Sequence, residues 1–90
     1  MIEKLDGLTL KGLLQNHGFG FSKSLGQNFL CDERILSAIA DDADIKKGDT
    51  VLEIGPGAGT LTRVMAKRGA RVTAVEIDKT LLPVLAETLE

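Results

Sequence analysis

The segment that most limits how this chain can fold is the turn at residues 53–59 (EIGPGAG), which carries three glycines in alternate positions. A short β-branched and apolar run, 50–54 (TVLEI), leads into it, and a helical pattern at 60–68 (TLTRVMAKR) follows. A second β-type run at 71–77 and a further helical pattern at 80–89 come next. This order predicts an α/β fold in which parallel strands are joined by crossover helices.

A glycine-rich turn between a strand and a helix is typical of nucleotide-binding sites. Glycine lets the backbone turn sharply and lets a ligand approach where a Cβ would block it. Glu76, at the end of the second β-type run, can accept hydrogen bonds from both hydroxyls of an adenosine ribose; the alternative is an exposed glutamate at a strand end. Glu53 is expected to face the ligand cleft or to mark a partly open face, because an unpaired buried carboxylate is unfavourable. Asp78 is expected to cap the following helix.

The part of the chain before the turn predicts two helices and a long loop. Residues 9–16 form a short helical pattern with Thr9 as its cap, and residues 17–30 have the glycine content of a loop. A second helix is expected to begin at Asp32 and a turn to occupy residues 46–49. The apolar residues expected to face inward are Leu10, Leu13 and Leu14 in the first helix, Ile35, Leu36, Ile39 and Ala40 in the second, and Leu61, Val64 and Met65 after the turn.

Composition excludes several classes of protein. A net charge of −2 gives no overall basic field for nucleic acid, and no apolar run reaches the roughly 20 residues of a membrane span. Cys31 is the only cysteine, so we expect a buried or half-buried thiol in a reducing, cytoplasmic setting rather than a nucleophile. His17 is expected to cap a helix rather than to catalyse. A solvated helix face is the simplest interpretation of the basic group Arg63, Lys67, Arg68 and Arg71.

The spacing of the glycines distinguishes a methyl donor from a dinucleotide. In the dinucleotide pattern G-x-G-x-x-G the third glycine comes one residue later than Gly59, and Pro56 has no place in it. The form E-x-G-x-G-x-G, with Glu53 leading, resembles motif I of the S-adenosylmethionine-dependent methyltransferases. The resemblance implies a Rossmann-like methyltransferase fold, with S-adenosyl-L-methionine as cofactor, and we favour it over a dehydrogenase.

A second motif, upstream of the turn, indicates the substrate class. Residues 23–30 (KSLGQNFL) resemble the K-x-x-G-Q-N-F-L segment of the ribosomal RNA adenine N6,N6-dimethyltransferases. The resemblance continues through the turn at 53–59 and through 75–78 (VEID), and it covers roughly residues 19–89. The small-subunit rRNA enzymes are the most similar branch; the large-subunit enzymes of the erythromycin-resistance type share both motifs and stay open as an alternative.

The resemblance implies a donor site built from the upstream loop and the glycine turn. The loop would contact the methionine and adenosine parts, the glycines would bring backbone against the donor, and the carboxylate would hold the ribose hydroxyls. The implied cofactor-binding residues are Gln27, Asn28, Leu30, Gly55, Gly57 and Glu76. Lys23 is a candidate contact to RNA phosphate. The clustered aromatic residues Phe19, Phe21 and Phe29 either cover the adenine or pin the loop to the domain.

The resemblance also implies a division of the chain and a missing part. Residues 1–30 are interpreted as an N-terminal helix and cofactor-covering loop, and residues 31–90 as the first βαβα portion of a truncated methyltransferase domain. The catalytic Asn/Asp-Leu-Pro-Tyr/Phe segment does not occur, so no catalytic or metal-binding residue is expected here. The full-length parent would dimethylate adenosines of small-subunit ribosomal RNA or its ribosomal precursor, while this fragment is expected to be inactive and to self-associate through a bared sheet edge. The opposed hypothesis is a non-catalytic module that binds donor or RNA.

Overall fold

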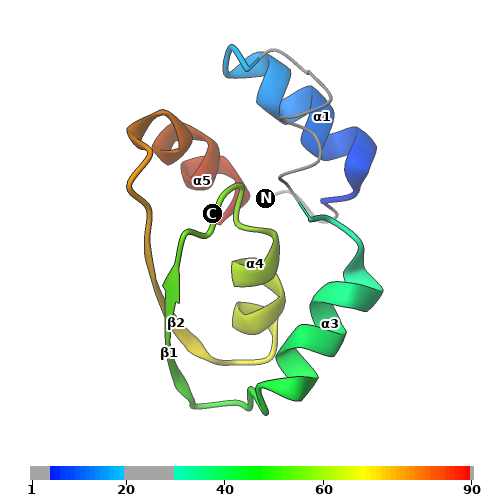
Figure 1. Cartoon of the computed structure of the whole chain (residues 1–90), viewed down its shortest axis with the longest axis vertical. Helices are drawn as coiled ribbons and strands as arrows, with labels where there is room; N and C mark the ends of the chain where they lie inside the picture. Colours follow the sequence, from blue (N-terminus) through cyan, green and yellow to red (C-terminus); the bar gives the residue numbers. More distant parts are fainter. Residues whose placement is uncertain (1–4, 20–29, 90) are drawn as a thin grey trace.

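The computed structural model describes residues 5–19 and 30–89, and Figure 1 shows how their elements are arranged. The helices are α1 (Gly7–Asn16), α3 (Glu33–Asp42), α4 (Thr60–Lys67) and α5 (Leu82–Thr88), the last preceded by the 3₁₀ helix η1 (Lys79–Leu81). The strands are β1 (Thr50–Ile54) and β2 (Arg71–Val75). From β1 onward the order is strand, helix, strand, helix, and the predicted α/β class is confirmed.

Strands β1 and β2 pair in parallel, with Leu52 opposite Thr73 and Ile54 opposite Val75. The pairing ends where Gly55 donates its N–H to the carbonyl of Val75 at 2.8 Å and β1 turns away, so β2 is shorter than the predicted 71–77. Leu52 and Ile54 are 66% and 72% exposed. An apolar, β-branched strand such as 50–54 is typical of parallel sheets buried on both faces, but in the described part of the chain helices cover one face of this sheet only.

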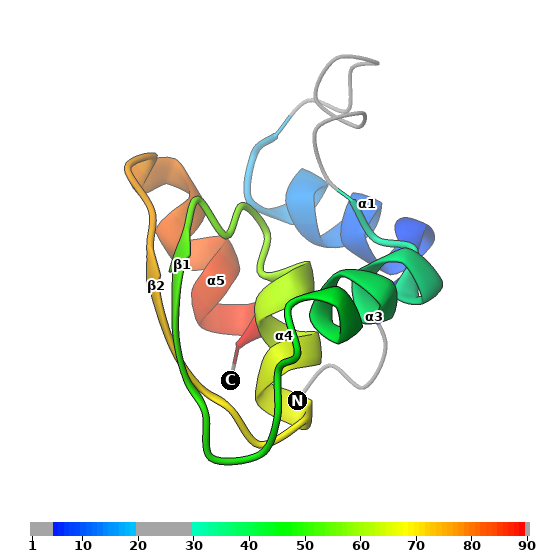
Figure 2. The same ribbon diagram turned by 60° about the horizontal axis from the view of Figure 1, so that its bottom comes forward.

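Helix α4 lies between the sheet and α3 in both ribbon views (Figures 1 and 2). It buries Thr62 and Met65, while the predicted Leu61 and Val64 are half-buried. Helix α3 buries Leu36 and Ala40 as predicted. The prediction that Ile35 and Ile39 also face inward is wrong. Because α3 packs against α4 along one side, its buried stripe is narrow, and the residues beside that stripe remain 48% and 39% exposed: Ile35 and Ile39.

Side-chain caps set the starts of three helices. Helix α1 begins at Gly7 because Asp6, not the predicted Thr9, is its cap: the N–H of Thr9 donates to Asp6 Oδ1 at 2.9 Å. The predicted caps of the other two are confirmed, with Asp32 bound to the N–H of Arg34 and Asp78 to the N–H of Thr80, each at 3.0 Å.

The backbone N–H of Arg34 lowers the pKa of the Asp32 carboxyl. A carboxyl whose pKa is lowered on folding stabilises the fold above its unfolded pKa, and the contribution of Asp32 is lost as the pH falls through the lowered value.

The apolar core joins both ends of the described chain. Leu10, Leu13 and Leu14 of α1 are buried as predicted, and they cluster with Leu81 and Val84 near α5 and with one residue of the glycine turn, Ala58. Cys31 and Phe19 pack against this cluster, and Cys31 is half-buried as expected. For Phe19 this favours the pinning interpretation, whereas Phe21 and Phe29 lie outside the described residues. No helix in the described ranges is long and apolar enough to cross a membrane.

Two of the basic residues expected on a solvated face connect helices instead. Arg68 donates to the carbonyl of Ser37 at 3.1 Å and lies 2.7 Å from Asp41 Oδ1, which joins α4 to α3. Arg63 donates to the carbonyl of Thr88 at 2.7 Å, which joins α4 to α5. Lys67 and Arg71 are exposed, as the solvated-face interpretation requires. A guanidinium can donate to backbone carbonyls while its aliphatic stem packs on a helix. The solvated-face interpretation therefore holds for the lysine and one arginine of the basic group, but not for the other two arginines.

His17 is the C-cap of α1, as expected, and its ring also contacts α5. Its Nε2 lies 2.8 Å from Glu87 Oε1, a contact between residues far apart in the sequence. The end of α1 is therefore attached to α5 by a polar contact as well as by the apolar core.

Replacement of Gly59 should damage the fold through both its backbone conformation and its packing. Its φ is +86°, and an added Cβ would lie 2.9 Å from Thr88 Oγ1 and 3.0 Å from Leu89 Cδ2. Gly59→Ala combines left-handed strain with overpacking, and we expect it to lower the free energy of unfolding by about 2–4 kcal/mol. The matched Gly55→Ala, at φ +72° with open space, should lose about 1 kcal/mol. Urea unfolding followed by circular dichroism compares the two, and equal losses would contradict the packing role of Gly59.

Candidate functional site

The glycine turn has a backbone shape that few other sequences could adopt. Gly55, Gly57 and Gly59 have φ values of +72°, +60° and +86°, all in the left-handed region. The N–H of Gly59 donates to the carbonyl of Pro56 at 2.9 Å, and the carbonyl of Gly59 accepts the N–H of Arg63 as α4 begins. The turn is thus ordered by its own backbone bonds and presents main-chain atoms at the end of β1.

An open pocket of about 200 Å³ lies beside this turn. Its lining combines turn backbone at Gly55 and Gly57, one carboxylate, Glu53, and apolar side chains that include Leu30 and Leu61. The structure thus brings Leu30, from the upstream motif, to the same pocket as the two glycines. Small-molecule sites usually measure roughly 300–1,000 Å³, so the pocket has room for part of a nucleotide-sized ligand.

Glu76 is held against the turn by two hydrogen bonds. Its Oε1 accepts the N–H of Gly57 at 3.0 Å, and its Oε2 accepts the N–H of Asp78 at 3.0 Å. Glu76 is half-buried, which argues against a freely exposed glutamate at a strand end. It does not line the pocket itself, but each carboxylate oxygen can accept a second hydrogen bond. The carboxylate therefore links the glycine turn to the turn after β2 and can still accept further donors.

Glu53 faces the pocket, the first of the two alternatives that the sequence left open. It is half-buried on the helix-facing side of β1, and the hydroxyl of Thr62 on α4 donates to its Oε1. Thr62 was not predicted from the sequence, because a threonine within a helix is usually exposed at the surface. The available signal was Glu53 itself, since a carboxylate inside an apolar strand needs a donor on the helix that packs against it.

Three predicted site residues lie outside the described part of the chain: Lys23, Gln27 and Asn28. Of the other predicted residues, Leu30, Gly55 and Gly57 meet at the pocket, and Glu76 reaches its border through the bond to Gly57. The predicted donor-site residues that the structure describes are thus brought together by the fold.

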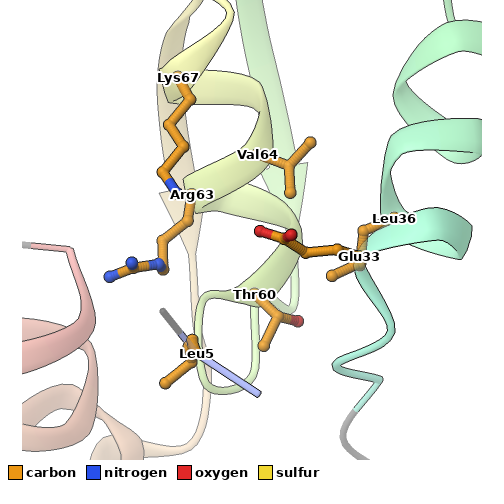
Figure 3. Close-up of a pocket in the computed structure, with 7 residues that line it drawn as sticks. All are labelled: Leu5, Glu33, Leu36, Thr60, Arg63, Val64 and Lys67. Carbon is orange, nitrogen blue, oxygen red and sulfur yellow. The ribbon is translucent and has the colours of Figure 1, made fainter. Parts of the chain in front are cut away.

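A second hollow lies between α3 and α4, where the side chains of Glu33 and Leu36 point toward α4 (Figure 3). Leu5, Thr60 and Val64 are among the residues that complete its lining. Its volume is about 20 Å³, room for little more than one water molecule. The pocket beside the glycine turn is therefore the better candidate for a ligand site.

Comparisons with known proteins agree with this geometry. The family model described as ribosomal RNA adenine dimethylase matches residues 18–90. Proteins named ribosomal RNA small subunit methyltransferase A are similar: that of Deinococcus radiodurans is 60% identical over 89% of this chain and 27% of its own length. The protein from Alkaliphilus oremlandii is 56% identical over 88% of this chain and 28% of its own.

The chain spans less than a third of the length of these relatives. The match begins in the upstream motif region and runs through the glycine turn and the second strand, the segments on which the predicted resemblance rested. The fold, an N-terminal portion of a Rossmann-like methyltransferase domain, is consistent with it. The chain belongs to the ribosomal RNA adenine dimethylase family.

Proposed function

We propose that this chain supplies the donor-binding half of an enzyme that dimethylates N6 of adenosines in small-subunit ribosomal RNA, with S-adenosyl-L-methionine as methyl donor. The observation that carries the proposal is the meeting of Leu30, Gly55 and Gly57 at one pocket, with Glu76 bonded to its border. The name of the relatives, ribosomal RNA small subunit methyltransferase A, favours this substrate over large-subunit RNA.

The residues of the pocket suit the parts of such a donor. Open space at the Gly55 Cβ position lets a ligand approach the backbone, and Leu30 and Leu61 offer an apolar wall. The carboxylate of Glu76 would accept the ribose hydroxyls, using the lone pairs that its bonds to Gly57 and Asp78 leave free. When bound, the donor supplies a methyl group activated by its sulfonium.

The resemblance extends the site beyond the described residues. We propose that Gln27 and Asn28 complete the donor contacts and that Lys23 contacts RNA phosphate. In this proposal residues 1–30 form the helix and cofactor-covering loop, and residues 31–90 form the first βαβα portion of the domain. Partners are ribosomal RNA and the precursor of the small ribosomal subunit, and the setting is cytoplasmic.

Catalysis needs a group that orients the adenine amine in line with the methyl carbon. The Asn/Asp-Leu-Pro-Tyr/Phe segment expected for that role is not in the sequence. We therefore propose that the chain by itself binds donor without transferring methyl groups. A purely non-catalytic module is the competing candidate, and grafting the chain onto a relative distinguishes the two: a chimera in which it replaces the matching segment of the Deinococcus radiodurans protein should methylate small-subunit RNA.

Donor binding gives the direct test of the Glu76 assignment. Calorimetry should show that the chain binds S-adenosylhomocysteine, and that Glu76→Ala weakens binding by about 1–3 kcal/mol because a charged acceptor is lost. Glu33→Ala, an exposed glutamate on α3, is the matched control and should bind like the parent. Unchanged affinity in Glu76→Ala would contradict the ribose role. Binding of NAD without S-adenosylhomocysteine would instead support the dehydrogenase alternative.

The outer edge of β1 is the proposed route of self-association. Within the described residues β1 pairs with β2 alone, and its outward side chains Leu52 and Ile54 are mostly exposed. An apolar strand edge of this kind pairs readily with a second copy. Sedimentation should show a fraction of dimer that rises with protein concentration. Leu52→Lys should lower this fraction more than Thr73→Lys on β2 does. A monodisperse monomer at all concentrations would contradict the proposal.

A further inference from the structure

We propose that His17 and Glu87 form a positioning pair, which holds the end of α1 against α5 and so sets where the upstream motif, residues 23–30, begins relative to the glycine turn. The inference deepens the proposed function and rests on it, because the pair affects donor binding only if the motif contacts the donor. The observations that carry the inference are the contact between the two side chains, the backbone cap of α1 and the packing of α5 on the glycine turn.

The contact joins two residues that are 70 positions apart in the sequence. His17 Nε2 lies 2.8 Å from Glu87 Oε1, and the two side chains are 20% and 51% exposed. A hydrogen bond has a preferred direction and apolar contacts do not, so this contact restrains the rotation of α1 on α5 more than the leucine core does. A pair this exposed adds little to stability. Its main effect is therefore on the orientation of α1.

The chain leaves α1 in a direction that the helix itself determines. The backbone N–H groups of His17, Gly18 and Phe19 all donate to carbonyls in the last turn of α1. Gly18 has a φ of +83°, the left-handed conformation that commonly ends a helix. A rotation of α1 therefore moves Phe19 with it, and with Phe19 the start of the segment that leads to the upstream motif.

Glu87, the other partner, belongs to a helix that packs directly on the glycine turn. A Cβ added at Gly59 would lie 2.9 Å from Thr88 Oγ1 and 3.1 Å from Leu85 Cδ2. Thr88, the residue after Glu87, is only 1% exposed. Because α5 and the turn are in such close contact, a group bound to Glu87 is held at a fixed place relative to the turn.

Both ends of the segment that carries the upstream motif are then placed relative to the donor pocket. Leu30 lines the pocket itself, and Phe19 packs against the core cluster that contains Ala58 of the turn. In the proposed function, Asn28 of the motif contacts the donor. Loss of the pair lowers the fraction of molecules in which Asn28 is correctly placed, and the affinity for the donor falls by the same factor.

The test measures binding of S-adenosylhomocysteine to the 90-residue chain by calorimetry. His17→Ala and Glu87→Ala should each weaken binding by about 2- to 5-fold, the range expected for one exposed pair. The double variant should bind as well as either single variant, because each substitution removes the same contact. His17→Gln should bind like the parent, since its side-chain amide can still donate to Glu87.

Two backgrounds show whether the pair acts through the upstream motif. In Asn28→Ala, which already lacks the motif contact, His17→Ala should weaken binding by a smaller factor than in the parent. In Glu76→Ala, which affects the turn side of the site, His17→Ala should weaken binding by its full factor. Gln15→Ala, an exposed position on the same helix, is the matched control and should bind like the parent.

Urea unfolding checks that each variant is folded under the binding conditions. If His17→Ala does not fold, Glu87→Ala replaces it in both backgrounds, since Glu87 lies at an exposed position of α5.

Each remaining outcome decides a separate question. The same loss in the Asn28→Ala and Glu76→Ala backgrounds would show that the pair does not act through the motif, and it would overturn the inference. Additive losses in the double variant, or full affinity of both single variants, would also overturn it while leaving the proposed function intact. A parent chain that does not bind S-adenosylhomocysteine would contradict the proposed donor site itself, and the inference would fail with it.

Discussion

The packing of the glycine turn into the apolar core is the contact on which the rest of this structure depends. Ala58, in the middle of the turn, is buried among leucines of α1 and residues of η1 and α5. Gly59, its neighbour, lies so close to α5 that a methyl group would collide with Thr88 and Leu89. The turn whose backbone borders the pocket is thus also the segment against which the two outer helices pack. Because interiors tolerate little change in volume, the shape of the turn and the positions of α1 and α5 are coupled.

Polar contacts around this core connect elements that are far apart in the sequence. Glu76 joins the glycine turn to the turn after β2, and His17 joins α1 to α5. Arg63 and Arg68 join α4 to α5 and α3. Several of these bonds end on backbone atoms, which have fixed directions, so they restrain orientation more than they add stability. The carboxylate of Glu76 and the turn backbone are therefore held in a fixed arrangement by the fold itself.

Much of the local structure was predictable because it depends on neighbours in sequence. The caps Asp32 and Asp78 follow from side chains that bond to backbone two residues away. Helix α1 ends at His17, whose backbone N–H bonds to carbonyls of the last turn. The predictions of burial that were wrong depend instead on packing between elements that are not adjacent in the sequence. Thr62 rather than Leu61 is buried on α4 because Glu53 and the sheet decide which side of the helix is covered. Ile39 is exposed because α3 has a helix on one side only, which no periodicity can reveal.

The sequence by itself determined the parallel βαβ order, the left-handed turn that only closely spaced glycines adopt, and the family, because these depend on local sterics and on motifs at fixed spacing. Only the tertiary structure decided what the carboxylates do. Whether Glu76 is exposed or bonded to Gly57, and whether Glu53 faces a pocket or solvent, depends on side chains brought together by packing rather than on their neighbours in the chain. The same holds for Gly59, whose intolerance of a Cβ comes from α5, a helix formed by residues more than twenty positions later.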